Sequence, residues 1–310
     1  MRPRFQWNLG LRALALGERT LVMGILNVTP DSFSDGGRFF DPQAAINHGL
    51  ALLEDGADIL DIGGESTRPG APTSSGKSPA LAGAVSANEE LDRVLPVIEA
   101  IKRHSPGSVL SIDTYKSEVA RQAIEAGVEI VNDVSGFTWD SAMAATIAGR
   151  PCGAILMHVR GLPHEWRTLP PSTDIVSLVC EGLRTGAAAA LSAGIDHHSL
   201  VLDPGFGFGK NFDENYPLLA RFVEFHALGF PLLAAVSRKS FLGRTVSERI
   251  SGISQTATLL LPPVARDTAT LAAIVAAALA GAHIVRVHSV RPAVEALAIA
   301  DAILHATERE

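Results

Sequence analysis

The sequence has few of the cysteines that would mark a secreted or zinc-binding protein. Its two cysteines, Cys152 and Cys180, stand far apart and outside any C-x-x-C pattern. This excludes a dense disulfide framework and gives no zinc-site spacing. We expect both thiols to be reduced and structural, in a cytoplasmic protein.

Long apolar runs are also missing. The most apolar stretch, 271–279, is rich in alanine and too short to cross a membrane. Residues 1–5 include basic side chains, but no apolar core of a secretion signal follows them. The sequence therefore predicts no membrane segment.

Positive charge and several familiar catalytic motifs are scarce as well. The chain has 26 Lys and Arg against 33 Asp and Glu, a net charge of −7, without a basic run. This argues against nucleic-acid binding. Neither G-x-S-x-G nor H-E-x-x-H occurs. The segment GFGFGK at 205–210 lacks the spacing of a dinucleotide fingerprint or a P-loop. Its glycines are interpreted as letting the backbone approach a flat ligand, with a plain turn as the alternative.

What is present is a repeated unit, an apolar strand that ends in polar residues and is followed by a helix. The 310 residues, 47% of them hydrophobic, suit one α/β domain over 1–310. The expected strands are 21–26, 59–62, 109–112, 128–131, 154–157, 200–202, 232–236 and 284–287. Eight such units predict a (β/α)8 TIM barrel, and a doubly wound open sheet is the alternative.

The segments between these strands give further expectations. Residues 5–16, within an N-terminal segment 1–20, predict a short strand or hairpin that plugs the bottom of the barrel. Helices are expected from Pro42, capped by Asp41, over 89–104, from about Tyr115, over 175–193 and from Pro292. The segment 71–88 is rich in Ala, Gly, Ser and Pro, which predicts a long mobile loop.

Three polar side chains follow three different strands and can converge on one pocket. Asp113, Asn132 and Asp203 together offer hydrogen-bond acceptors and donors. They suit a heterocycle with an amidine-like edge, because a carboxylate can accept two N–H groups. The alternative is that each side chain caps the helix after it.

A second group of residues indicates an anionic substrate. Lys239, Arg286 and His288 lie at the ends of the last two strands, the region where this fold often binds phosphate. Ser240 begins a helix, whose first amides can hold an anion. Asn27, at the end of the first strand, could aim its amide oxygen at a metal or an anionic ligand. Together they predict a phosphorylated substrate.

Several segments resemble the dihydropteroate synthase family. The first is NVTPDSFSDGG at 27–37, and the second is DIGGESTRPG at 61–70. The segments DT at 113, NDVS at 132, MH at 157, DPGFGFGK at 203, SRKSF at 237 and RVH at 286 follow in family order. The resemblance covers the chain from about Leu21 and implies a TIM barrel and a transferase of folate biosynthesis.

The resemblance implies condensation of 6-hydroxymethyl-7,8-dihydropterin pyrophosphate with 4-aminobenzoate, Mg²⁺ as cofactor, a homodimer and sensitivity to sulfonamides. The implied pterin-binding residues are Asp113, Asn132, Asp203, Lys239 and Arg286. The pyrophosphate-binding residues are Asn27, Arg286 and His288, and the metal ligands are Asn27 and Asp35. The aminobenzoate-binding residues are Phe33, Thr67, Arg68, Pro69, Lys239 and Ser240. The catalytic group is Asn27, Asp35, Arg68, Lys239, Arg286 and His288, without a general base.

The chain departs from the family pattern in three places. The segment 71–88 is longer than usual, Ser289 replaces a common Asp, and 247–266 matches weakly.

Two other functions are open to a chain with these residues. A methyltetrahydrofolate-dependent methyltransferase would keep the pterin-binding residues but would not need Lys239 and Ser240. A non-catalytic paralogue would bind ligand without turnover.

Overall fold

Eight parallel strands form the centre of the computed structural model, which describes residues 2–29, 41–67, 84–251 and 261–307. The strands are β3 (Leu21–Asn27), β4 (Ile59–Gly63), β5 (Val109–Asp113), β6 (Ile130–Asp133), β7 (Gly153–Met157), β8 (Leu200–Asp203), β9 (Leu233–Ala234) and β10 (Ile284–Val287). Their order is β8-β7-β6-β5-β4-β3-β10-β9. The two edge strands meet at a parallel bridge between Leu202 and Leu232. The predicted (β/α)8 barrel is confirmed.

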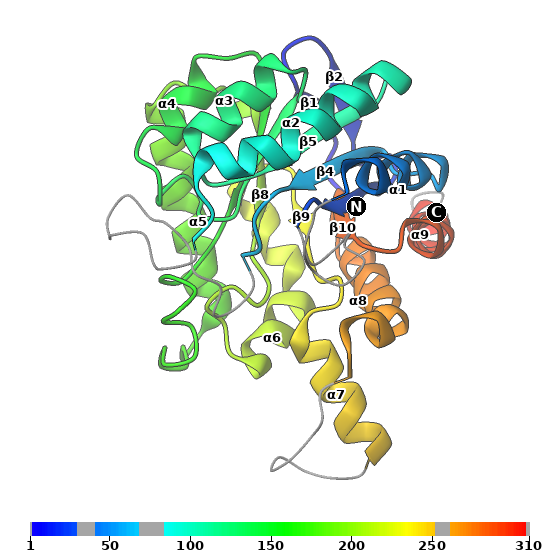
Figure 1. Ribbon diagram of the computed structural model, residues 1–310. Helices are drawn as coiled ribbons and strands as arrows, with labels where there is room; N and C mark the ends of the chain where they lie inside the picture. Colours follow the sequence, from blue (N-terminus) through cyan, green and yellow to red (C-terminus); the bar gives the residue numbers. More distant parts are fainter. Residues whose placement is uncertain (1, 30–40, 68–83, 252–260, 308–310) are drawn as a thin grey trace.

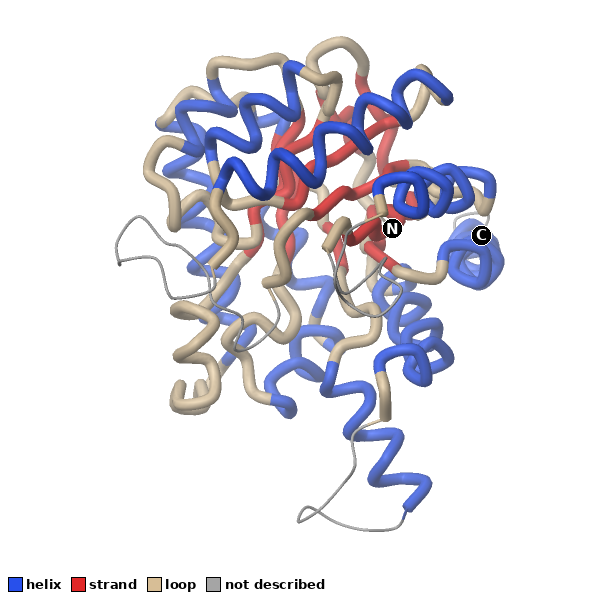
Figure 2. Tube along the Cα trace, in the orientation of Figure 1, coloured by secondary structure: helices blue, strands red, loops and turns tan. Residues whose placement is uncertain are grey.

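Helices surround these strands, as Figures 1 and 2 show. They are α1 (Pro42–Glu54), α2 (Ala87–His104), α3 (Ser117–Glu125), α4 (Met143–Ala148), α5 (Ile175–Ser192), α6 (Asn215–Ala220), α7 (Ser240–Ser251), α8 (Asp267–Leu279) and α9 (Val290–Thr307). Short 3-10 turns span His197–Ser199, Phe212–Glu214, Phe222–Leu228 and Pro263–Arg266. Helix α7 projects away from the barrel (Figure 1).

Helix α1 begins where the sequence predicts. The Asp41 carboxylate accepts a hydrogen bond from the Gln43 amide, and Pro42 occupies the first turn, where its missing N–H has no cost. Gly56, just beyond the helix, has a φ of 101° that favours glycine.

Five expected boundaries are wrong, and one of them is that of β6, which spans Ile130–Asp133 rather than 128–131. Helix α2 begins at Ala87, inside the expected loop 71–88, because the Ser86 hydroxyl caps it. Helix α3 begins at Ser117 rather than Tyr115, since the Asp140 carboxylate accepts from the Ser117 amide. Helix α9 already begins at Val290. Strand β9 has only two residues, Leu233–Ala234, where a strand over 232–236 is expected.

The N-terminal hairpin closes the end of the barrel at which the strands begin, as predicted. Strands β1 (Phe5–Asn8) and β2 (Ala13–Leu16) pair antiparallel. Trp7 is fully buried, and its indole nitrogen donates to the Ser199 carbonyl over 2.9 Å. It packs with apolar residues from the strand starts, namely Leu21, Ile59, Val109, Ile130, Val201, Leu233 and Ile284. We call this region the N-terminal end.

Among the described helices, α5 alone has a length and apolar composition that would allow it to cross a membrane. In this fold it belongs to the outer layer of the barrel, where Val179, Leu183 and Ala187 on one face are buried. A core-facing helix has the same composition.

Candidate active site

A cavity of about 380 Å³ lies at the opposite, C-terminal end of the barrel. Its lining comes from the ends of strands far apart in sequence and includes Asn27, Glu65, Thr67, Asp113, Phe208, Ser237, Arg238, Lys239, Ser240, Arg286 and His288. Loops at this end carry the active sites of TIM-barrel enzymes, so the cavity is the candidate site.

At the floor of this cavity Arg286, on β10, is bonded to carboxylates from two other strands, β4 and β5. Its Nε donates to Asp61 Oδ2 over 2.5 Å, and its Nη2 donates to Asp113 Oδ2 over 2.6 Å. Asn132 donates its amide N–H to the same Asp61 oxygen over 2.9 Å. One carboxylate oxygen of Asp61 therefore holds both Arg286 and Asn132, while its buried Oδ1 has no partner.

The predicted acidic residues on this floor are poorly solvated. Burial raises the pKa of Asp113 to about 7, although the Arg286 cation acts in the opposite direction. Burial also raises the pKa of Asp203 to about 6, and one of its oxygens accepts from the Gly205 amide. Asp113 and Asn132 bind the floor network, so the helix-capping alternative does not describe them. A ligand that brings N–H donors would stabilise their charged forms.

Lys239, which follows β9, also lines the cavity. Its ammonium nitrogen is 4.0 Å from the centre of the Phe208 ring, a cation–π contact. Burial lowers the pKa of Lys239 to about 8, so the side chain is mostly protonated at neutral pH. Phe208 in turn meets the edge of Trp166 at 5.2 Å between ring centres. This arrangement fixes a cation beside an aromatic face.

The surroundings of His288, the potentially cationic member of the second group, favour its neutral form. Burial lowers the pKa of His288 to about 3. Its backbone amide donates to Ser237 Oγ over 3.2 Å, and Ser237 Oγ is 2.9 Å from its Nδ1. If the hydroxyl donates to Nδ1, the ring hydrogen is on Nε2. The ring therefore offers a hydrogen bond rather than a charge.

The chain matches known proteins over nearly its whole length. The model of the family "Pterin binding enzyme" matches residues 23–288. The dihydropteroate synthase of Mycobacterium leprae is 43% identical over 286 residues, which cover 92% of this chain and 94% of the relative. The chain belongs to the dihydropteroate synthase family of pterin binding enzymes.

Two solved structures of this family have the same fold. Dihydropteroate synthase from Xanthomonas albilineans with 4-aminobenzoic acid has a TM-score of 0.81 and 40% identity, and covers 98% of this chain and 99% of its own. The Yersinia pestis dihydropteroate synthase in a sulfonamide drug complex has a TM-score of 0.81 and 39% identity. The alignment covers 94% of this chain and 97% of that chain.

Some residues that the family resemblance assigns fall outside the described ranges. Phe33, Asp35, Arg68 and Pro69 are among them. The other assigned residues line the cavity, except Asn132 and Asp203, which are buried. The proposed roles of all these residues remain predictions.

Magnesium, which the resemblance implies, can be compared with the donors present. The described residues contain no group of three or more His, Cys, Asp or Glu that could hold a metal ion. Mg²⁺ often uses only one or two protein oxygens, with water and substrate phosphates completing its coordination. Asn27, half-buried at the cavity, fits such a ligand.

Two glycines of the segment 205–210 have a structural reason to be glycine. A Cβ at Gly205 would lie 2.0 Å from the His158 carbonyl oxygen, and one at Gly209 would lie 2.3 Å from that of Arg160. Both have positive φ. They allow the loop after β8 to lie against the loop after β7, a use that the sequence interpretation missed.

Two residues that organise the cavity, Asp61 and Arg238, have no role that residue patterns alone indicate. The signal for Asp61 is a carboxylate within an apolar strand, ILDIG, where an unpaired charge is costly. Arg238 is exceptional only in its backbone conformation, with a φ of 57°. No sequence pattern marks that conformation at an arginine.

Proposed function

We propose that the protein is a transferase that joins 6-hydroxymethyl-7,8-dihydropterin pyrophosphate to 4-aminobenzoate, giving 7,8-dihydropteroate and pyrophosphate. The observation that carries this proposal is the polar floor beneath the cavity. Asp61, Asp113, Asn132 and Arg286 form one connected network there. Membership of the dihydropteroate synthase family supplies the reaction.

The floor suits the pterin ring. Asp113 and Asp203 are carboxylates with raised pKa values, so N–H groups from the ring would relieve their poor solvation. Asn132 adds a side chain that both donates and accepts. Lys239, held over Phe208, borders the same space with a cation that can contact the ring or the second substrate.

The rim suits the two anionic groups of the substrates. Asn27 and His288 would donate hydrogen bonds to the pyrophosphate, beside the positive charge of Arg286. Ser240 is the first residue of α7, so its hydroxyl and the first free amides can hold the carboxylate of 4-aminobenzoate. Thr67 borders the same cavity.

In the reaction the C–O bond to pyrophosphate breaks, and the resulting carbocation is delocalised into the pterin ring. The aminobenzoate nitrogen attacks that carbon and then loses a proton to solvent or to pyrophosphate. No strong base is needed, because an aniline nitrogen is neutral at pH 7. Mg²⁺ bound through Asn27 and Asp35 would neutralise charge on the departing pyrophosphate. The residues around the cavity orient both substrates.

The assembly and location of the protein belong to the same proposal. Apolar side chains on α8 and α9 are exposed, namely Leu279, Ile299 and Ile303. They support the homodimer that the resemblance implies, which light scattering would test. We propose a cytoplasmic location, in keeping with two free thiols.

Pyrophosphate release by the purified protein tests the function. The reaction contains dihydropterin pyrophosphate and Mg²⁺, with or without 4-aminobenzoate. We expect aminobenzoate-dependent release with an equal amount of dihydropteroate, and competition by a sulfonamide. Pterin binding without any product would reject this function in favour of a non-catalytic paralogue.

A further inference from the structure

The turn between β9 and α7 has an unusual backbone conformation. Arg238 has a φ of 57°, and Phe137 is the only other described residue besides glycine with a positive φ. This left-handed region is costly for a residue with a side chain. Arg238 separates Ser237, which contacts His288, from Lys239 and Ser240 at the cavity. The strained residue thus lies directly between site residues.

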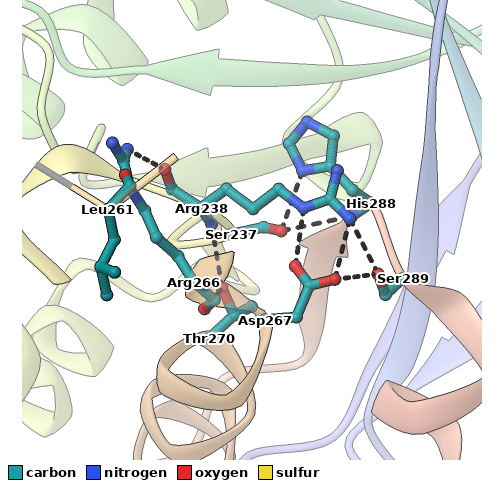
Figure 3. A network of polar contacts seen from close by, with 8 residues as sticks. All are labelled: Ser237, Arg238, Leu261, Arg266, Asp267, Thr270, His288 and Ser289. Atoms are coloured by element: carbon teal, nitrogen blue, oxygen red, sulfur yellow. Dashed lines mark hydrogen bonds and ion pairs between the residues drawn. The ribbon is translucent and has the colours of Figure 1, made fainter. Parts of the chain in front are cut away.

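The backbone of Arg238 is held by the segment that begins α8. Its amide donates to Thr270 Oγ1 over 2.9 Å. Its carbonyl accepts from Arg266 Nη1 over 2.8 Å, and the Thr270 hydroxyl donates to the Arg266 carbonyl over 3.0 Å. Figure 3 shows these contacts meeting at one turn. Both the backbone N–H and the backbone C=O of Arg238 are therefore hydrogen-bonded.

The side chain of Arg238 is held by the same segment. Its Nε donates to Asp267 Oδ1 over 2.6 Å, and its Nη2 donates to Asp267 Oδ2 over 2.8 Å. Ser289, after β10, accepts from Arg238 Nη2 over 3.1 Å and donates to Asp267 Oδ2 over 2.8 Å (Figure 3). Such paired, charge-assisted contacts fix direction as well as distance. They connect β9, α8 and β10.

We propose that Asp267 is a positioning residue, which holds Arg238 in its left-handed conformation and thereby aims Lys239 and Ser240 at the substrates. This inference rests on the proposed function. If the carboxylate is lost, the turn can relax toward an ordinary conformation. Because Lys239 and Ser240 follow directly in the chain, their side chains would turn away from the cavity. The second substrate would then bind less well.

The first test moves the carboxylate across the network. Asp267→Ser removes it, and adding Ser289→Asp restores one beside Arg238. We expect Asp267→Ser to raise the KM for 4-aminobenzoate roughly tenfold, as the cost of a left-handed residue suggests, with kcat changed less. The double variant should recover most of that loss. A raised KM with no recovery, or an unchanged KM, would overturn the proposal.

Asp58→Asn is the matched control. Asp58 also accepts a paired contact from an arginine, Arg19, and a backbone amide, from Val22, but at the N-terminal end of the barrel. The Asp58→Asn substitution should lower the melting temperature of the protein without changing its KM for 4-aminobenzoate. If it raised that KM as much as Asp267→Ser, general loss of stability would explain both variants, and the proposal would fail.

The second test compares Arg238→Gly with Arg238→Ala, and does not depend on Asp267→Ser folding. Glycine adopts the left-handed conformation without the penalty that alanine has. The KM of Arg238→Gly for 4-aminobenzoate should therefore be roughly tenfold lower than that of Arg238→Ala. Equal KM values would mean that the guanidinium acts by direct contact, which would overturn the proposal. Failure of the proposed function is distinct, because the unaltered protein would then form no dihydropteroate.

Discussion

The two ends of the barrel use buried charge in opposite ways. At the N-terminal end one carboxylate, Glu129, lies between two cations, and is 2.5 Å from Arg12 Nε and 2.9 Å from Lys102 Nζ. At the cavity end one cation, Lys116, lies between two carboxylates, Glu65 and Glu90. The first arrangement leaves both carboxylate oxygens paired. The second leaves one oxygen on each carboxylate without a partner.

The same contrast extends to other buried polar atoms. Among the described residues seven side chains have a buried polar atom without a partner, and five of them lie in the cavity half: Asp61, Glu65, Glu90, Ser111 and His158. Unpaired buried groups reduce stability. The N-terminal end therefore stabilises the fold, while the cavity end gives up stability for groups that a ligand can satisfy.

The largest expected effect is on stability at the N-terminal end. Trp7→Ala empties the plug of the barrel, so the free energy of unfolding should fall by about 3–5 kcal/mol. Denaturant unfolding measures this loss. The fraction that remains folded should keep its KM for both substrates. If the KM for either substrate rose strongly, the two ends would not be independent.

The next effect concerns the cavity floor. Asp61→Asn weakens the anchor of Arg286, so kcat/KM for dihydropterin pyrophosphate should fall about 100-fold, in line with breaking a buried charge pair. The melting temperature should change little, because Asp113 still pairs with Arg286. Glu129→Gln is the control at the N-terminal end. It should lower the melting temperature and leave kcat/KM nearly unchanged. A similar kinetic loss in both variants would contradict the comparison.

Pterin affinity should also depend on pH. The pKa values of Asp113 and Asp203 in the free protein are about 7 and about 6, and in the proposed pterin site both groups would accept N–H groups in their ionised form. Affinity should therefore fall as pH drops below 7, by at most about tenfold per pH unit for each group. Calorimetry in two buffers should detect proton release on binding at pH 6. Constant affinity from pH 8 to 5 would exclude these carboxylates as the acceptors.

The smallest effect is expected for Asn27→Ala at the rim. Loss of one polar contact should slow pyrophosphate release by about tenfold or less, while pterin binding remains nearly unchanged. Rapid-quench kinetics and equilibrium titration separate the two quantities. An equal loss of rate and affinity would show that Asn27 contributes to binding rather than to pyrophosphate departure.

Local sequence patterns predicted the barrel and the position of the cavity. Apolar strands ending in Asp113, Asn132 and Asp203 repeat along the chain, and parallel strands bring their ends together. Loose alternation of apolar and polar residues over 5–16 also predicts the short strand or hairpin there. In the structure Trp7 of this hairpin is buried among apolar residues of the strand starts.

Contacts between distant segments could not be predicted in this way. Asp61 and Arg286 are 225 positions apart, and their pairing depends on strand register across the barrel. The neutrality of His288 depends on its burial, which no local pattern reveals. Strand β9 begins one residue later than expected, at Leu233, because the Leu232 amide donates to the His283 ring.

Hydrogen exchange of the unaltered protein, with and without 7,8-dihydropteroate, tests most directly whether the two ends have separate tasks. Ligand should increase protection at the ends of β4, β5, β6 and β8 and in the turn before α7. The hairpin β1–β2, which lies at the opposite end of the barrel from the ligand, should not change. Protection gained at the hairpin, or none gained around the cavity, would contradict the account.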